Sequence, residues 1–232
     1  MSKSSYLIKN MGILTISNFS SKILVFLLVP LYTSVLSTKE YGTYDLAVST
    51  ATLLYPILTL NIVDAVMRFL MDKESDKKAI ASIGFKYVSI SSVLFGFIML
   101  FFYITGIWSD INGLEGYIFS YYISYVINQF FIQFAKGLEK VKNMGVAGVL
   151  STVVTIIANL FFLLVIRWGL IGFFLANILA QIVSAIYLFF KTEIYNYIVI
   201  KRQPIALQRE MLIYSVPLIA TVVGWWVNSC AD

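Results

Sequence analysis

The side chains of this sequence that could do chemistry are polar residues set inside long apolar runs. Lys22 lies near the middle of the run from Met11 to Leu36. Asn18 precedes it by four residues and Thr15 precedes Asn18 by three, so the three side chains would share one face of a helix. A cation at that depth in a membrane costs at least about 2.5–3.5 kcal/mol unless water, an acid or an anionic ligand compensates it. We therefore expect Lys22, with its two polar neighbours, either to contact an anionic substrate in a hydrated cavity or to form a buried pair with a carboxylate.

The second apolar run carries an acid and a base on one face. Asp64 precedes Arg68 by four residues, which is the favourable order for an ion pair within a helix. We expect these two side chains to form a structural or gating ion pair, with substrate contact as the alternative. Asp64, or Asp45 near the start of the same run, could also be the carboxylate partner of Lys22.

Amide and hydroxyl side chains recur at helical spacing on the later apolar runs. The amides that we single out as candidates for binding a polar substrate are Asn128, Gln129, Asn159, Asn177 and Gln181. Such side chains commonly form hydrogen bonds between membrane helices, and they also line hydrated cavities. Both interpretations stay open. A polar stripe on nearly every run indicates helices that surround something polar or that bond one another.

Several classes of site have no candidate residues in this sequence. It contains no histidine, which removes the commonest metal ligand and acid–base catalyst. Its single cysteine, Cys230, has no partner for an internal disulfide. A Gly-rich phosphate-binding loop and the Gly-x-Ser-x-Gly pattern of hydrolases are also absent from the sequence. We therefore expect no metal site, no cofactor, no catalytic residues and no enzymatic activity.

The composition indicates which elements must position these polar side chains. The chain is 59% hydrophobic and 12% charged, whereas soluble domains are roughly 45–50% apolar and about 25% charged. Six runs reach the roughly 20 apolar residues that cross a bilayer: Met11–Leu36, Leu46–Met71, Ile80–Ile107, Tyr117–Phe134, Val146–Ile166 and Leu170–Phe190. A seventh begins at Met211 and has reached Val227 when polar residues follow. Backbone groups cannot stay unpaired in lipid, so we predict an all-α membrane protein, a six-helix transmembrane bundle with a truncated seventh span.

The cations assign the ends of the bundle to the two sides of the membrane. All but three of the 17 Lys and Arg residues fall in the N-terminal tail, in the even-numbered connectors or at the span ends beside them. The exceptions are Lys39, Arg167 and Lys22. Because Lys and Arg accumulate in cytoplasmic loops, we predict a multi-pass plasma-membrane protein with a cytoplasmic N-terminus. This bias accounts for the net charge of +5, so we expect no nucleic-acid partner. We expect bilayer lipids to surround the apolar spans.

We expect three parts along the chain. Residues 1–190 form the six-span lobe, residues 191–210 a basic cytoplasmic connector at the membrane interface, and residues 211–232 the truncated seventh helix. Pro30 in the first span and Pro56 in the second each remove a helix hydrogen bond and permit a kink. Many membrane helices carry static kinks, so a bending role for either proline stays open.

Seven short segments, spread over essentially the whole chain, have an order and spacing typical of one family. They are Leu28–Thr33, Leu36–Gly42, Leu60–Phe69, Gly137–Lys140, Gly169–Ala176, Tyr214–Ile219 and Trp225–Asn228. Together they resemble the bacterial polysaccharide flippases, the Wzx-type O-antigen and capsule exporters within the multidrug/oligosaccharidyl-lipid/polysaccharide exporter superfamily.

The resemblance implies two six-helix lobes that face each other in a V, with the substrate between them. This chain would be the N-terminal lobe, from a fragment or a truncated gene, and its partner would be the missing C-terminal lobe. The substrate would be an undecaprenyl-diphosphate-linked oligosaccharide, moved to the outer leaflet of the bacterial plasma membrane by rocking of the lobes. Lys22 would attract the diphosphate or an acidic sugar, the amides would bond sugar hydroxyls, and Asp64 would be the candidate for ion coupling. The polysaccharide polymerase machinery would be a further partner.

Two other classes of function stay open. One is an exporter of other cargo in the same superfamily, such as a cationic-drug or ion antiporter, for which we expect an acidic cavity rather than Lys22. The other is a membrane subunit of polysaccharide assembly that does not transport, or an integral-membrane glycosyltransferase or polymerase. Such an enzyme should carry large exterior loops, and the exterior loops predicted here are short.

Overall fold

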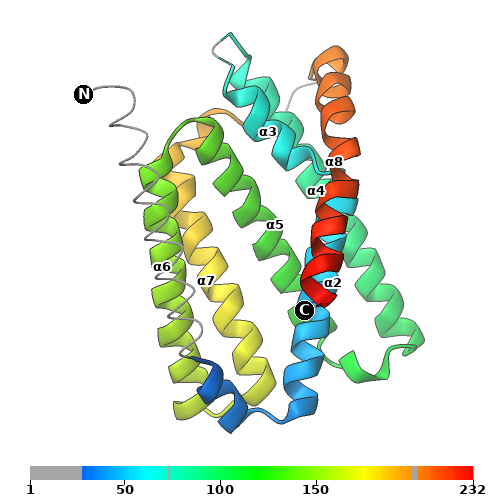
Figure 1. The fold of residues 1–232 in the computed structure, drawn as a ribbon, viewed down its shortest axis with the longest axis vertical. Coiled ribbons are helices and arrows are strands. Elements are labelled where there is room, and N and C mark those ends of the chain that lie inside the picture. The colour runs from blue at the N-terminus through cyan, green and yellow to red at the C-terminus, as the bar shows by residue number, and fades with distance from the viewer. Residues whose placement is uncertain (1–27, 73, 200–202, 232) are drawn as a thin grey trace.

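The computed structural model describes residues 28–72, 74–199 and 203–231. The regular elements within these ranges are helices, and no strand is formed in them (Figure 1). The predicted all-α membrane fold is confirmed. The first predicted span is described only from residue 28, and residues 28–35 are helical. The earlier part of that span lies outside the described residues.

Seven longer helices follow in chain order. They are α2 (Thr38–Leu58), α3 (Ile62–Leu70), α4 (Lys77–Thr105), α5 (Glu115–Gly137), α6 (Val141–Asn159), α7 (Gly169–Thr192) and α8 (Ile205–Ala231). The π-helical segment η2 (Leu160–Val165) prolongs α6. Two short 3-10 helices, η1 (Ser109–Ile111) and η3 (Ile194–Asn196), lie in the connectors.

Most of these helices match the predicted spans. Four of the described helices are long and apolar enough to cross a membrane, namely α4, α6 with η2, α7 and α8. The number rises to five if α2 and α3 count as one bent span. The predicted fourth span, α5, is not among them, because polar side chains interrupt its apolar sequence. α5 instead contacts α2, α3, α4, α6 and α7, so other helices cover much of its polar surface.

The second predicted span is broken. α2 and α3 meet at an angle of 60° across residues 59–61. Pro56 lies near the end of α2 and permits the kink. Leu60 and Asn61 complete the break with positive φ angles of 52° and 50°, a left-handed conformation that asparagine tolerates better than leucine. A new helix therefore begins at Ile62, with Asp64 in its first turn.

Close packing holds the central helix between its neighbours. At Gly84 in α4, an added Cβ would lie 2.5 Å from a Val66 side-chain atom and 2.7 Å from a Phe130 ring atom, so only glycine fits between α3 and α5. Phe95 of α4 stacks on Tyr122 of α5, with 4.0 Å between the ring centroids. Small residues and tight van der Waals contact are the usual means of joining membrane helices, since lipid provides no hydrophobic force between them.

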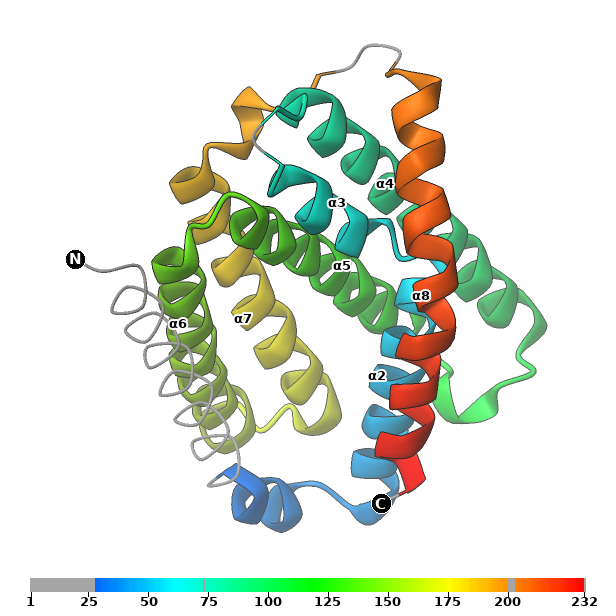
Figure 2. The ribbon, with the colours of Figure 1, turned by 45° about the horizontal axis from the view of Figure 1, so that its top comes forward.

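The remaining helices form two groups around this centre. Figure 2 shows α5 and α7 side by side, with α6 beyond α7 and with α2 and α8 on the opposite side of the bundle. The C-terminal end of α7 and the segment after it are both tied to the bundle by hydrogen bonds. Lys140 Nζ donates to the Lys191 carbonyl at 3.0 Å, and the Val199 amide donates to the Ser82 hydroxyl at 2.9 Å. The predicted division of the chain at residues 190 and 210 stays a prediction.

Candidate functional site

A carboxylate lies at the start of α3, directly after the break. The Asp64 side chain is partly buried, and its Oδ2 accepts a hydrogen bond from Asn61 Nδ2 at 3.0 Å. Its Oδ1 accepts a second hydrogen bond from Gln133 Nε2 of α5. Hydrogen bonds to an ionised acceptor are among the stronger ones in proteins. The acid therefore joins the break in the second span to the central helix.

The predicted Asp64–Arg68 ion pair is not formed in this structure. The Arg68 side chain is exposed. Within the described ranges, the ion pair that is present joins Lys39 and Asp110 at 3.2 Å. Both residues lie in α3, but amide donors from Asn61 and from Gln133 of α5 occupy both carboxylate oxygens of Asp64. A gating role for Asp64 and Arg68 stays a prediction.

Tyrosines and glutamines continue along α5 from the carboxylate. Tyr55 of α2 lies edge-on to Tyr125, with 5.4 Å between the ring centroids, and Tyr121 stacks on Tyr125 at 6.1 Å. Gln129 lies one helical turn from Tyr125 on α5, and the Gln181 side chain of α7 lies beside Tyr121. These contacts connect α2, α5 and α7 through polar side chains.

We call these two groups of side chains, which meet on α5 where Gln129 and Gln133 lie one turn apart, the polar row. Its members are Asn61, Asp64, Gln133, Gln129, Tyr125, Tyr55, Tyr121 and Gln181. Three of them, Asp64, Gln129 and Gln181, are predicted site residues that the fold brings together. The amides and phenols both donate and accept hydrogen bonds, and the carboxylate accepts. Such a row suits a ligand rich in hydroxyl groups.

The other predicted amides lie nearby but bond differently. Asn159 and Asn177 each donate through Nδ2 to the backbone carbonyl four residues earlier in their own helices, at 2.8 and 2.9 Å. The amide oxygens of Asn128, Asn159 and Gln181 are buried, and the described residues offer them no hydrogen-bond partner. Buried acceptors of this kind usually meet water or a ligand. Substrate contact by Asn128, Asn159 and Asn177 stays a prediction.

Three predicted site residues, Thr15, Asn18 and Lys22, lie outside the described residues. Sequence reasoning missed two members of the polar row that hold the carboxylate. Gln133 continues the stripe begun by Gln129 four residues earlier, which is the signal that could have found it. Asn61 lies five residues after Pro56 within a predicted span, and asparagine adopts the left-handed conformation more readily than most residues.

Comparisons with known proteins identify the family. The sequence matches the family described as polysaccharide biosynthesis protein over residues 7–232. A comparison with curated protein sequences gave no match.

Two solved structures share the fold. One is a MOP superfamily transporter from Pyrococcus furiosus, described as having a binding pocket of reverse polarity that suggests a different function. It has a TM-score of 0.61 and 18% identity, over 92% of this chain and 50% of that one. The other is a multidrug resistance MATE family transporter of the MOP superfamily in an outward-facing conformation, with a TM-score of 0.57 and 16% identity over the same shares.

At these identities the likeness shows the fold alone, and this chain spans about half the length of both transporters. The family match is independent of that likeness and extends over nearly all of the sequence. The chain therefore belongs to the polysaccharide biosynthesis protein family, which confirms the resemblance found in the sequence.

Proposed function

We propose that this chain forms one lobe of a transporter that moves an oligosaccharide linked to undecaprenyl diphosphate across the bacterial plasma membrane. The observation that carries the proposal is the polar row, a line of amides, phenols and one carboxylate within an apolar bundle. Sugar hydroxyls donate and accept hydrogen bonds, as the amides and phenols do. The match to a family of polysaccharide biosynthesis proteins supports a glycan as the cargo.

The charge of the diphosphate calls for a cation as well as hydroxyl-binding groups. Lys22, with Asn18 and Thr15 on the same predicted helix face, would supply that cation in the first span. Its part in the proposal rests on the sequence, because it lies outside the described residues. The first span would then hold the charge of the head group while the polar row binds the sugars.

Movement would follow from alternating access between two lobes. Because the chain spans about half the length of the solved transporters, a C-terminal lobe would face the polar row and enclose the cargo. The reaction makes and breaks no covalent bond, so it calls for no catalytic residue. Ion coupling would fall to Asp64, and the polysaccharide polymerase machinery would receive the glycan.

The orientation of the lobe in the membrane follows from its cations. The N-terminus and the even-numbered connectors would be cytoplasmic. A cysteine introduced at Ser75 or Asn143 should then resist an impermeant thiol reagent in intact cells, and a cysteine at Asp110 should react. Reaction at the first two positions with protection of the third would invert the orientation.

Polysaccharide export in a strain that lacks its own flippase tests the proposed cargo. The full-length gene should restore export. Gln129→Leu removes one amide of the polar row with little change in volume, so it should lower export several-fold at an unchanged protein level. Ser89→Ala on α4, where the hydroxyl donates only to the Phe85 carbonyl of its own helix, is the control and should export normally. Normal export by a normally abundant Gln129→Leu protein would contradict sugar binding by the polar row.

One observation favours a second candidate function, the export of cationic drugs. The polar row contains an acid, Asp64, and no base, and such a site would attract a cation. Cells that express the full-length protein should then gain resistance to cationic drugs, and Asp64→Asn should abolish it. Drug resistance without any polysaccharide export would indicate that the transported molecule is a drug and not a glycan.

A further inference from the structure

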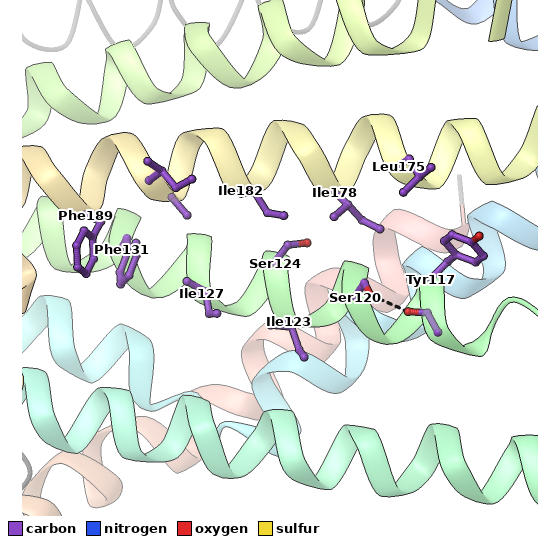
Figure 3. Close-up of a pocket in the computed structure, with 13 residues that line it drawn as sticks. Tyr117, Ser120, Ile123, Ser124, Ile127, Phe131, Leu175, Ile178, Ile182 and Phe189 are labelled. Carbon is purple, nitrogen blue, oxygen red and sulfur yellow. Dashed lines mark hydrogen bonds between the residues drawn. The ribbon is translucent and has the colours of Figure 1, made fainter. Parts of the chain in front are cut away.

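A long apolar groove lies between α5 and α7 (Figure 3). On α5 it lies on the side turned away from Tyr125 and Gln129. Its volume is about 770 Å³. Ile127, which lines the groove, lies two positions from Tyr125 and two from Gln129, and residues two apart point to nearly opposite sides of a helix. At one end of the groove Phe131 and Phe189 meet, with 6.0 Å between the ring centroids.

The wall of the groove presents hydrocarbon, although two serines line it. The Ser120 hydroxyl donates to the Gly116 carbonyl at 2.8 Å, and the Ser124 hydroxyl donates to the Tyr121 carbonyl at 2.9 Å. Each hydroxyl is therefore satisfied by its own helix, as the dashed line at Ser120 in Figure 3 shows. An added Cβ at Gly116 would meet nothing within 4 Å, so small residues leave this end of the groove open.

The length of the groove limits what can fill it. Its lining extends from Gly116 to Phe131 on α5 and from Leu175 to Phe189 on α7. At 1.5 Å per residue these segments are about 22 Å and 21 Å long. One leaflet supplies only about 15 Å of a hydrocarbon core roughly 30 Å thick. A groove of this length that lies within the hydrocarbon core must pass the bilayer midplane, and a phospholipid tail anchored at one interface would fill only part of it.

We propose that this groove holds the isoprenoid tail of the lipid-linked substrate. The proposal rests on the function proposed above. A polyprenyl chain is long enough to cross the midplane, and it would gain dispersion contacts along a wall of branched and aromatic side chains. Lipid is as apolar as the groove, so this packing, rather than escape from water, provides the attraction. Because the groove reaches into both leaflets, the tail can stay bound while the head group changes sides.

Photo-crosslinking with a polyprenyl phosphate that carries a photoreactive group on its tail tests the proposal. The full-length protein in bilayer vesicles should be labelled on α5 and α7 at residues that line the groove. Gly116→Leu and Ser120→Phe, which fill the open end, should each lower this labelling several-fold. The matched control is Gly148→Leu on α6, where an added Cβ also meets nothing within 4 Å, and its labelling should equal that of the wild type.

Each other outcome overturns the proposal. Equal labelling of the groove by a phospholipid with a photoreactive tail would make it an ordinary lipid-facing surface. Absence of groove labelling in the unmodified protein, or labelling that survives in both filled variants, would show that the tail lies elsewhere. Failure of the proposed function is distinguishable, because a protein that restores no polysaccharide export could still show groove labelling by polyprenyl phosphate.

Discussion

On one side of the α5–α7 pair, Gln133 donates to the Asp64 carboxylate and tyrosines pack beside further amides; on the other, serines bond their own backbone and isoleucines line an apolar groove. Neighbouring positions of α5 separate these two sides, with Gln129 on the first and Ile127 on the second. From this contrast we infer that one helix pair could bind both the polar and the apolar end of an amphipathic ligand. A head group needs hydrogen-bonding groups in place of water, whereas a tail needs only close packing.

The two sides should also respond differently to substitution. Removing a donor on the polar side leaves a buried acceptor without its partner, which costs about 1–3 kcal/mol, and more for a charged group. Removing a serine hydroxyl in the groove leaves no interhelical partner behind. We therefore expect that substitutions which lower export at a normal protein level will lie on the polar side, at residues that do not stabilise the fold.

The largest effect should come from Lys22, which would extend the polar side into the first span. Lys22→Ala in the full-length protein should abolish polysaccharide export at a nearly normal protein level, because the anion loses its cation. Lys22→Arg should keep part of the activity, since the charge persists while the donor geometry changes. The measurement is export and protein level side by side.

A structural role for Lys22 would give a different pattern. If it neutralises a buried acid, Lys22→Ala should lower the protein level, because an unpaired buried charge costs about 3–5 kcal/mol. Asp64→Asn or Asp45→Asn should then rescue it. Normal export by a normally abundant Lys22→Ala protein would exclude both roles.

The next effect should come from Gln133, which holds Asp64 across two helices. Gln133→Leu removes the donor to one carboxylate oxygen and should destabilise the protein by about 1–3 kcal/mol. Thermal unfolding in detergent measures the loss. Asp64→Leu in the same protein should recover most of it, because the stranded charge is gone. If the stability changes of the two single substitutions simply add in the double variant, the two side chains are not coupled.

A smaller effect should come from the break that positions the carboxylate. Leu60 has a φ of 52° and an exposed side chain, so Leu60→Gly removes backbone strain at little cost in packing. We expect this change to raise stability by up to about 1 kcal/mol, and Leu60→Val to lower it. Unfolding temperatures of the two variants measure the difference. A destabilised glycine variant would show that the break is not left-handed at this residue.

The smallest effect should come from the groove. Ser120→Ala removes a hydroxyl that bonds only its own helix, so we expect a stability change within about 0.5 kcal/mol. The same unfolding assay measures it. A loss as large as that of Gln133→Leu would mean that the groove side also carries polar contacts, and the contrast between the two sides would disappear.

Helical periodicity and hydropathy were enough to predict the membrane fold and part of the polar side. Spacing placed Gln129 and Gln181 on stripes, and the structure brings both to tyrosines of α5. The predicted sixth span, Leu170–Phe190, matches α7 to within two residues at each end. These features follow from local sequence, because burial in lipid and helical spacing act over a few turns.

The partner of Asp64 could not be predicted in the same way. An acid four residues before a base indicates an ion pair only if one helix continues through both and nothing closer competes. In the structure α3 does run through both residues, but Asn61 at the break and Gln133, which lies 69 residues later in the chain, donate to the two carboxylate oxygens. Nothing in one sequence states which helix will pack there. The same limit applies to Asn159 and Asn177, whose stripes indicate a face but not what covers it.

The most direct test compares how readily a water-soluble reagent reaches the two sides of α5. Single cysteines at Gln129 and at Ile127 would be introduced into a cysteine-free full-length protein in native membranes and exposed to a small hydrophilic thiol reagent. We expect rapid reaction at position 129, slowed by lipid-linked oligosaccharide, and little reaction at position 127. Equal reaction at both positions, or reaction at 127 alone, would contradict the claim that the polar side carries the head group while the groove faces lipid.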